Sequence, residues 1–314
     1  MNFGRIIKKE IMSRPAKSEC CKKAFLAGLL RGSGSLYEKD GELGLDFLVP
    51  GEDEAMTVAS YFRSVFGYEI REISVSEDRL NRKDKYVLGL SGDGAKVILK
   101  ELGILTEDKE GFAVNLKLYG NIILKECCLK AFMRGLFVAS GSCTVPGVRS
   151  GDNSGYHAEL VFSHYTPALE TAEKLAQYDV NVKLTRRKGK YVAYLRSAEE
   201  IKNFTAFLSA PVSVLKLTDL MINRELSNKS NRQKNCDLGN VGKQVEAAQK
   251  QINAIKKIRA AEAFDSMREE LRETAKAREN NADDTLGELA EKLGITKSCL
   301  NHRLRKITEI AEKL

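Results

Sequence analysis

Two stretches of the chain, CCKKAFLAGLLRGSGSL at residues 20–36 and CCLKAFMRGLFVASGSC at residues 127–143, are copies of one another. They are identical at ten of seventeen positions and begin 107 residues apart, which marks an internal repeat. Small residues recur at every fourth position of each copy: Ala24, Gly28 and Gly32 in the first, Ala131, Gly135 and Ala139 in the second. Because small residues on one face let two helix backbones approach closely, we predict that the two copies form helices that pack together.

Each copy opens a half of the chain with the same order of elements. Alternating apolar and polar residues predict strands at GELGLDFLV (41–49) in the first half, and at HAELVFS (157–163) and KYVAYLR (190–196) in the second. Helical segments separate these strands. The sequence therefore predicts an α+β fold, with a pseudo-symmetric double αββαββα domain over residues 1–210 and halves at about 15–105 and 120–210.

The remaining third of the chain has a different character. Residues 211–227 favour a helix, and the following SNKSNRQKNCDLGN is rich in Asn, Ser and Lys, so we predict a helix and linker over residues 211–240. Contact of this linker with phosphate is a secondary expectation. From residue 241 to residue 314 apolar residues recur at helical spacing, which predicts an all-α C-terminal domain.

The segment Asp284–Ile307 fits a helix-turn-helix. Asp284 or Thr285 can cap a first helix, and Gly294 suits the turn, where a positive φ is often needed. Thr296 can cap a second helix. The apolar positions of that helix share one inward face, and they are Leu300, Leu304 and Ile307.

The opposite face of the second helix carries the side chains expected to meet DNA. At about 100° per residue, Ser298, Asn301, His302 and Arg305 point outward. These residue types contact base edges, arginine at guanine and asparagine at adenine. The flanking cations suit phosphates, and they are Lys297, Arg303 and Lys306. Backbone N–H groups at Thr296–Ser298 can add a phosphate contact. The alternative to a DNA-binding helix is a surface helix whose charges are incidental.

Charge and hydropathy indicate the partners and the location of the protein. The chain has 314 residues and a net charge of +8, which favours polyanionic partners. Charges near the N-terminus replace the apolar stretch of a signal peptide, and apolar runs fall short of the roughly 20 residues of a membrane span. We therefore expect a cytoplasmic, nucleoid-associated protein without a membrane partner.

The cysteines and histidines give no metal-binding pattern in the sequence. Seven cysteines include the adjacent pairs Cys20–Cys21 and Cys127–Cys128, but no CxxC occurs, and the three histidines lack zinc-like spacing. Neighbours on a helix diverge by about 100°, so neither pair readily forms a local disulfide. The adjacent pairs could indicate redox sensing, but the stronger interpretation is reduced thiols that act as small apolar residues, with no metal and no cofactor.

The residues LAGLLRGSG (26–34) closely resemble the signature of the LAGLIDADG homing endonucleases. The resemblance implies the paired αββαββα fold, with the two motif helices at the interface of a DNA-gripping saddle. In that family an acidic residue before the last glycine of each motif holds the catalytic metals. Ser33 and Ser140 stand at these positions, and Arg31 and Val138 stand at the earlier acidic position. Because neutral hydroxyls do not hold a hard divalent ion, we expect the fold without the chemistry.

The order of a degenerate LAGLIDADG domain and a helix-turn-helix resembles the WhiA family of bacterial sporulation and cell-division regulators. The resemblance covers nearly the whole chain, and its most specific parts beyond the repeats are NRQKNCDLGN (231–240), VEAAQKQI (245–252) and KSCLNHRLRKI (297–307). It implies a non-enzymatic transcription regulator, linked to sporulation, cell division and chromosome segregation, that binds double-stranded DNA through its helix-turn-helix.

Two alternatives remain open from the sequence. One is a residual metal-dependent DNA endonuclease, against which Ser33 and Ser140 argue. The other is a scaffold whose N-terminal domain binds a protein such as RNA polymerase or another regulator. The second alternative is compatible with DNA binding by the C-terminal domain.

Overall fold

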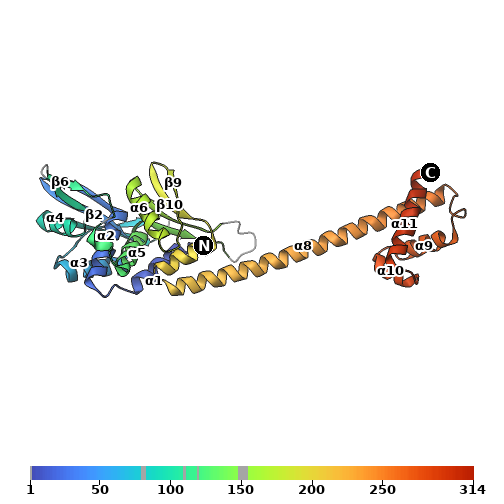
Figure 1. Ribbon diagram of the computed structural model, residues 1–314, viewed down its shortest axis with the longest axis horizontal. Helices are drawn as coiled ribbons and strands as arrows, with labels where there is room; N and C mark the ends of the chain where they lie inside the picture. Colours follow the sequence, from blue (N-terminus) through green and yellow to red (C-terminus); the bar gives the residue numbers. More distant parts are fainter. Residues whose placement is uncertain (1, 79–82, 109–110, 119, 148–154) are drawn as a thin grey trace. The chain divides into compact units, whose positions relative to one another are not determined.

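The computed structural model describes residues 2–78, 83–108, 111–118, 120–147 and 155–314 (Figure 1). The chain divides into two compact units, Met1–Arg224 and Glu225–Leu314. The first unit contains both copies of the repeat, and the second contains the helix-turn-helix segment.

The two halves of the N-terminal unit contain the same succession of elements. The first half consists of α2 (Glu19–Ser33), β1 (Gly34–Lys39), β2 (Glu42–Val49), α3 (Glu52–Phe66), β3 (Arg71–Asp78), β4 (Lys83–Ser91) and α4 (Gly92–Glu101). The second half consists of α5 (Glu126–Ser140), β7 (Gly141–Thr144), β8 (His157–Phe162), α6 (Tyr165–Ala176), β9 (Lys183–Arg187), β10 (Lys190–Leu195) and α7 (Ala198–Phe207). The predicted α+β class and the repeated αββαββα order are confirmed.

Further elements precede and separate the two halves. Helix α1 (Gly4–Ser13) comes first, and the hairpin of β5 (Leu105–Asp108) and β6 (Gly111–Val114) and the 3₁₀ turn η1 (Asn121–Ile123) lie between the halves. The repeat did not predict these elements because they have no counterpart in a second copy.

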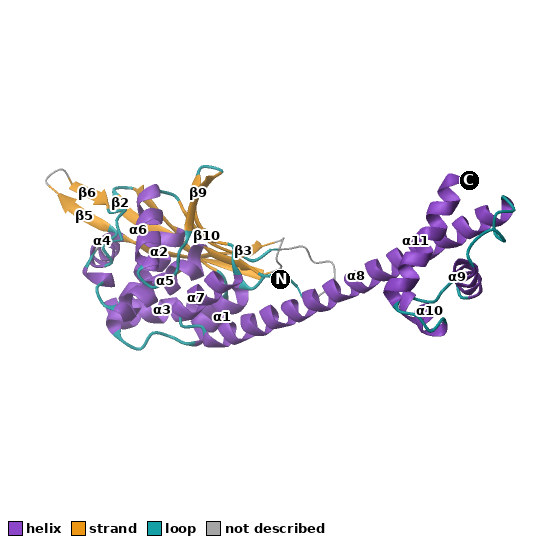
Figure 2. Ribbon diagram, turned by 45° about the vertical axis from the view of Figure 1, so that its right-hand side comes forward, coloured by secondary structure: helices purple, strands orange, loops and turns teal. Residues whose placement is uncertain are grey.

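Each half builds a four-stranded antiparallel sheet, in the order β1-β2-β4-β3 for the first half and β7-β8-β10-β9 for the second. Alternate residues of the central strands are buried: Leu45, Phe47 and Val49 in β2, and Ala158, Leu160 and Phe162 in β8. This alternation places one face of each sheet on the core. In Figures 1 and 2, α2 and α5 lie side by side below the strands.

Glycine lets the two motif helices touch backbone to backbone. A Cβ atom added to Gly28 of α2 would lie 2.0 Å from the carbonyl oxygen of Phe132 in α5. A Cβ atom added to Gly135 of α5 would lie 2.0 Å from the carbonyl oxygen of Phe25 in α2. Phe25 and Phe132 are equivalent positions of the repeat, so the contact is pseudo-symmetric. The predicted packing of the two helices through their small residues is confirmed.

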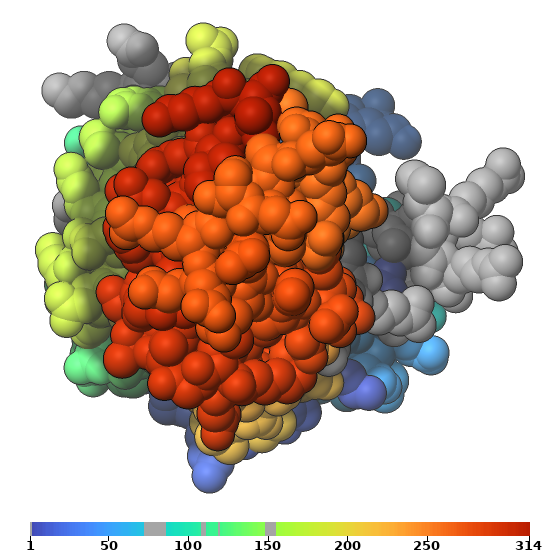
Figure 3. Space-filling view, turned by 90° about the vertical axis from the view of Figure 1, so that its right-hand side faces the viewer, coloured from blue at the N-terminus to red at the C-terminus, as the bar shows by residue number. Residues whose placement is uncertain are grey.

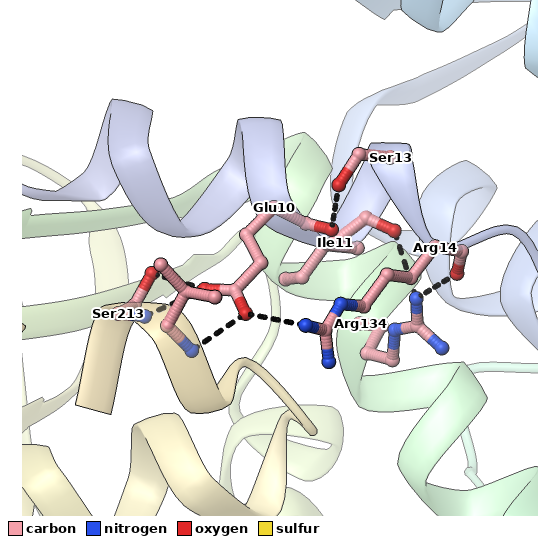
Figure 4. Close-up of polar contacts among 7 residues, drawn as sticks. Glu10, Ile11, Ser13, Arg14, Arg134 and Ser213 are labelled. Carbon is pink, nitrogen blue, oxygen red and sulfur yellow. Dashed lines mark hydrogen bonds and ion pairs between the residues drawn. The ribbon is translucent and has the colours of Figure 1, made fainter. Parts of the chain in front are cut away.

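A buried carboxylate joins α1 to the start of α8 (Pro211–Ala260) (Figure 4). Glu10 accepts hydrogen bonds from the backbone N–H groups of Val212 and Ser213, at 2.8 and 2.7 Å, and from the Ser213 hydroxyl at 2.6 Å. Burial opposes ionisation, but these three hydrogen bonds outweigh it and lower the pKa of Glu10. Nearby, Arg134 of α5 donates to the carbonyl oxygen of Arg14 at 2.5 Å. The start of α8 is thus anchored to the N-terminal unit.

Residues 211–240 differ from the predicted helix and linker, because α8 continues through them to Ala260 as one helix. The Asn- and Lys-rich residues 227–240 are exposed and helical. Their side chains pair along the helix, as in the hydrogen bond of 3.0 Å from Gln233 to Asp237. A composition rich in Asn, Ser and Lys fits an exposed helix as well as a linker, so it did not distinguish the two. The division between the compact units, after Arg224, falls inside this stretch.

The C-terminal unit is built from the second part of α8, α9 (Glu269–Asn280), α10 (Leu286–Lys292) and α11 (Lys297–Lys313). Apolar side chains from all four helices form its core: Ile255, Ile258, Ala275, Leu289, Leu300, Leu304 and Ile307. Figure 3 shows one face of this unit, with orange and red atoms packed closely together. None of the helices that the structure describes combines the length and the hydropathy that crossing a bilayer needs.

Candidate nucleic-acid interface

The first helix of the helix-turn-helix begins with a reciprocal cap. The Thr285 hydroxyl accepts from the Glu288 N–H at 3.3 Å, and the Glu288 carboxylate accepts from the Thr285 N–H at 2.8 Å. This is a capping box. Of the two caps that the sequence allowed, Thr285 is therefore the one that the fold uses.

The turn between α10 and α11 is set by Gly294, whose φ is +62°. The N–H of Gly294 donates to Glu291 at 3.0 Å, and the N–H of Ile295 donates to Ala290 at 3.0 Å. These two bonds make a Schellman motif, in which glycine tolerates the left-handed conformation without a Cβ clash. The Thr296 hydroxyl then accepts from the Cys299 N–H at 3.2 Å and caps α11. The predicted roles of Gly294 and Thr296 in the backbone are confirmed.

A buried arginine forms a hydrogen bond with the backbone just before this corner. Arg278 of α9 is 2 % exposed, and it donates to the carbonyl oxygen of Asp284 at 2.8 Å, just before α10. Burial lowers the pKa of Arg278, against the opposing charge of Asp284. Sequence reasoning missed this residue, because it lies in the alternating charges of residues 267–279, which indicate a solvated face. No local signal distinguishes Arg278 from its exposed neighbours.

The inward face of α11 is anchored as predicted, with Leu300, Leu304 and Ile307 all at most 1 % exposed. The opposite face presents exposed side chains to solvent: Ser298, Asn301, His302 and Arg305. The side chain of Arg305 is 73 % exposed, and within the described part of the chain it pairs with Glu309, 3.2 Å away along the same helix. Such an exposed pair is worth about 0–1 kcal/mol, so DNA can compete for the guanidinium.

The three flanking cations are not equivalent. Lys297 is exposed at the first turn of α11, and Lys306 is half-exposed, with a carboxylate oxygen of Glu309 at 3.8 Å. The side chain of Arg303 is only 17 % exposed and lies 3.7 Å from Glu270 of α9. The structure therefore leaves Lys297 and Lys306 accessible and holds Arg303 largely between helices.

The second candidate region lies at the C-terminal ends of α2 and α5. The Ser33 hydroxyl donates to the carbonyl oxygens of Leu29 and Leu48, at 3.3 and 3.1 Å. The Ser140 hydroxyl donates to the carbonyl oxygen of Leu136 at 3.2 Å. Both hydroxyls are thus engaged by backbone acceptors within the fold.

Arg31 stands where the homing endonucleases have an earlier acidic residue, and it holds the connection between the halves. Its guanidinium donates to the carbonyl oxygens of Leu102 and Gly103, at 3.1 and 2.6 Å. Burial lowers the pKa of Arg31 to about 10, against the opposing charge of Glu170. The role of Arg31 as a tether could not be seen from the sequence, because its acceptors lie about seventy residues away.

A hollow of about 450 Å³ lies beside Arg31, and none of its described lining residues is acidic. Its polar lining residues are Arg31, Asn115, Ser163 and His164. A hard divalent cation needs carboxylate oxygens and is repelled by a guanidinium, so these residues do not fit the metals of a homing endonuclease.

The geometry defines a class of protein: a paired LAGLIDADG-like domain whose acidic positions are replaced, followed by a helix-turn-helix. Three family models match the chain. They are described as "WhiA N-terminal LAGLIDADG-like domain" (residues 19–105), "WhiA LAGLIDADG-like domain" (129–227) and "WhiA C-terminal HTH domain" (230–311). The chain belongs to the WhiA family.

Relatives match over the full length. A "Probable cell division protein WhiA" from Bacillus cytotoxicus is 36% identical over 319 residues, covering 100% of this chain and 97% of the relative. One with the same name from Halalkalibacterium halodurans is 34% identical over 319 residues, covering 100% and 96%.

A solved structure shows the same fold. The crystal structure of full-length WhiA from Thermatoga maritima has a TM-score of 0.58 and 19% sequence identity, and it covers 100% of this chain and 99% of that one. The predicted family and fold class are therefore confirmed.

Proposed function

We propose that this chain is a non-catalytic transcription regulator that binds double-stranded DNA by placing α11 in the major groove. The observation that carries the proposal is the exposed face of α11, formed by Ser298, Asn301, His302 and Arg305 on a helix capped at its start and packed from behind. Arginine and asparagine contact base edges through paired hydrogen bonds.

Lys297 and Lys306 are proposed to anchor the DNA backbone. Both are accessible, and both flank the face that would enter the groove. Arg303 can contact phosphate only after it leaves Glu270, so its contribution is smaller. The N–H groups at Thr296–Ser298 point out of the first turn of α11, where a phosphate is favoured.

The N-terminal unit supports regulation rather than cleavage. Its motif helices end in Ser33 and Ser140, whose hydroxyls donate to backbone oxygens. The relatives carry the name "Probable cell division protein WhiA", and we propose cell division as the process that this chain serves. We also propose that the chain takes part in sporulation and chromosome segregation. Because its proposed partner is DNA, we propose that the protein is associated with the nucleoid in the cytoplasm.

The test is a pair of titrations with the full chain. A duplex selected by the wild-type protein from a random pool, and a scrambled duplex of equal length, are each titrated with wild type, Arg305→Ala and Arg305→Lys. Arg305→Ala should weaken binding to the selected duplex about 5- to 150-fold, which corresponds to the 1–3 kcal/mol of a bidentate base contact. Arg305→Lys keeps the charge but loses the planar fork, so its loss should fall mainly on the selected duplex.

A second comparison separates base contacts from phosphate contacts. Lys297→Ala should weaken binding to both duplexes and reduce the slope of log affinity against log salt by about 1. Lys313→Ala is the matched control, since Lys313 is exposed in the last turn of the same helix, beyond the helix-turn-helix. Equal losses on both duplexes for Arg305→Ala would show that Arg305 contacts no base.

A further inference from the structure

Four cysteines converge where the first turns of α2 and α5 meet. Cys20 and Cys21 lie in the first turn of α2, and Cys127 and Cys128 lie at the equivalent positions of α5. The sulfur atoms of Cys20, Cys21 and Cys128 all lie within 4.8 Å of one another. The sulfur of Cys127 lies 4.0 Å from that of Cys128. The fold therefore gathers two cysteine pairs that are 107 residues apart in the sequence.

The surroundings of this cluster act on its thiols in opposite directions. Two helix N-termini point their positive ends toward it, which stabilises negative charge on sulfur. Cys20 lies 3.4 Å from the Ser18 hydroxyl, and a hydrogen bond from that hydroxyl, followed by one from Cys128, lowers the pKa of Cys20. Burial raises the pKa of Cys21 and Cys128, so a bound cation would have to displace the protons of these two thiols.

The nearby carboxylates are already engaged. Glu19 lies 3.5 Å from Lys23, and Glu126 lies 2.6 Å from Lys130, each within its own helix. Cys20 and Cys127 are exposed, whereas Cys128 is buried. The cluster is thus open to solvent on one side and offers sulfur as its ligand.

We propose that Cys20, Cys21, Cys127 and Cys128 form a thiolate site for a zinc ion. Sulfur ligands select borderline and soft cations such as Zn²⁺ over Mg²⁺ or Ca²⁺. With Zn–S bonds of about 2.3 Å, tetrahedral geometry places sulfur atoms about 3.8 Å apart. Three sulfurs within 4.8 Å need only a small contraction, and rotation of the exposed Cys127 side chain supplies the fourth ligand.

The ion would fasten the two halves of the N-terminal unit at one end of their shared axis. Gly28 and Gly135 hold the helices together further along, through direct backbone contact. Four bonds to one ion would add a cross-link at the first turns, between segments that no described hydrogen bond between backbone groups joins. Binding should therefore raise the unfolding temperature of this unit.

The test uses the full chain, reduced and stripped of metal with a chelator, and titrated with Co²⁺ as a spectroscopic probe. We expect thiolate-to-cobalt charge-transfer absorption that saturates at one ion per chain and disappears when Zn²⁺ is added. Cys20→Ser, at an exposed position, should weaken Co²⁺ binding at least tenfold while leaving the circular dichroism spectrum unchanged. Cys236→Ser is the matched control, because Cys236 is an exposed cysteine of α8 outside the cluster.

Three outcomes would overturn the proposal. They are no charge-transfer band in the reduced wild-type protein, equal Co²⁺ binding by wild type and Cys20→Ser, and a stable disulfide among the four cysteines under reducing conditions. Because Cys20 is exposed, Cys20→Ser tests the loss of a ligand without changing a buried side chain. DNA binding does not enter this test, which is independent of the proposed function.

Discussion

Replacing Gly135 with alanine should drive α5 away from α2 and destabilise the N-terminal unit. The new Cβ would start 2.0 Å from the carbonyl oxygen of Phe25 and 2.9 Å from the nitrogen of Leu29. Real Cβ contacts essentially never fall below 3.0 Å, and both atoms belong to backbone, so no side-chain rotation relieves the overlap. The helices must separate by about 1 Å, in a core as dense as an organic crystal.

The magnitude follows from two opposing effects. Overpacking of a well-packed core costs about 1–3 kcal/mol, and a rigid backbone partner places this substitution near 3 kcal/mol. Alanine regains about 1 kcal/mol of helix propensity over glycine. The net loss is about 2 kcal/mol, which lowers the unfolding midpoint of a unit of this size by about 4–8 °C.

Circular dichroism and tyrosine fluorescence are suitable measurements, because the chain has no tryptophan. Gly239→Ala is the matched control: Gly239 is helical, and an added Cβ there meets nothing within 4 Å. It should stabilise its own unit by up to about 1 kcal/mol. An unchanged or raised midpoint for Gly135→Ala would refute packing of α2 and α5 through their glycine backbones.

Three further predictions concern acid stability, the helix-turn-helix corner and cleavage. Because the folded-state pKa of Glu10 is lowered, its stabilisation is present above the usual value of 4.5 and is lost as pH falls through the folded-state pKa. Glu10→Gln should therefore unfold with a free energy about 1–3 kcal/mol lower than wild type near pH 7. In denaturant titrations this difference in unfolding free energy should shrink as the pH falls, and a difference that is constant with pH would contradict the prediction. Arg278→Met should lower the free energy of unfolding by about 1–3 kcal/mol, because the carbonyl oxygen of Asp284 loses its hydrogen-bond donor. The same variant should weaken DNA binding, and an unchanged affinity in a gel-shift titration would show that the corner does not need Arg278. Supercoiled plasmid incubated with the full chain and Mg²⁺ should stay uncut, whereas nicking above the protein-free level would restore the nuclease hypothesis.

The repeat made most of the N-terminal unit predictable. Identity between the two copies located α2 and α5, and their shared small residues indicated a close crossing that Gly28 and Gly135 confirm. The corner of the helix-turn-helix was equally predictable, because the positive φ of Gly294 and the cap made by Thr296 involve only nearby residues of the chain. Local patterns report local structure.

The side-chain roles that the sequence did not predict depend on residues far away in the chain. Arg31 finds its acceptors beyond α4, about seventy residues further along the chain. Arg303 has the spacing of a phosphate contact, yet Glu270 from another helix lies beside it. The adjacent pair Cys20–Cys21 suggests no metal site by spacing, because its companions come from the other copy.

Having both motif helices in one chain frees each half to change alone. In a nuclease assembled from two identical subunits, every mutation alters both active centres at once. Here one half carries Arg31, which ties down the connecting segment, and the other carries Val138, which is buried in the core. The two halves share a glycine where their backbones cross, at Gly28 and Gly135, and differ where one has Arg31 and the other Val138. A duplicated scaffold can in this way keep its shape while its two sides take up separate tasks.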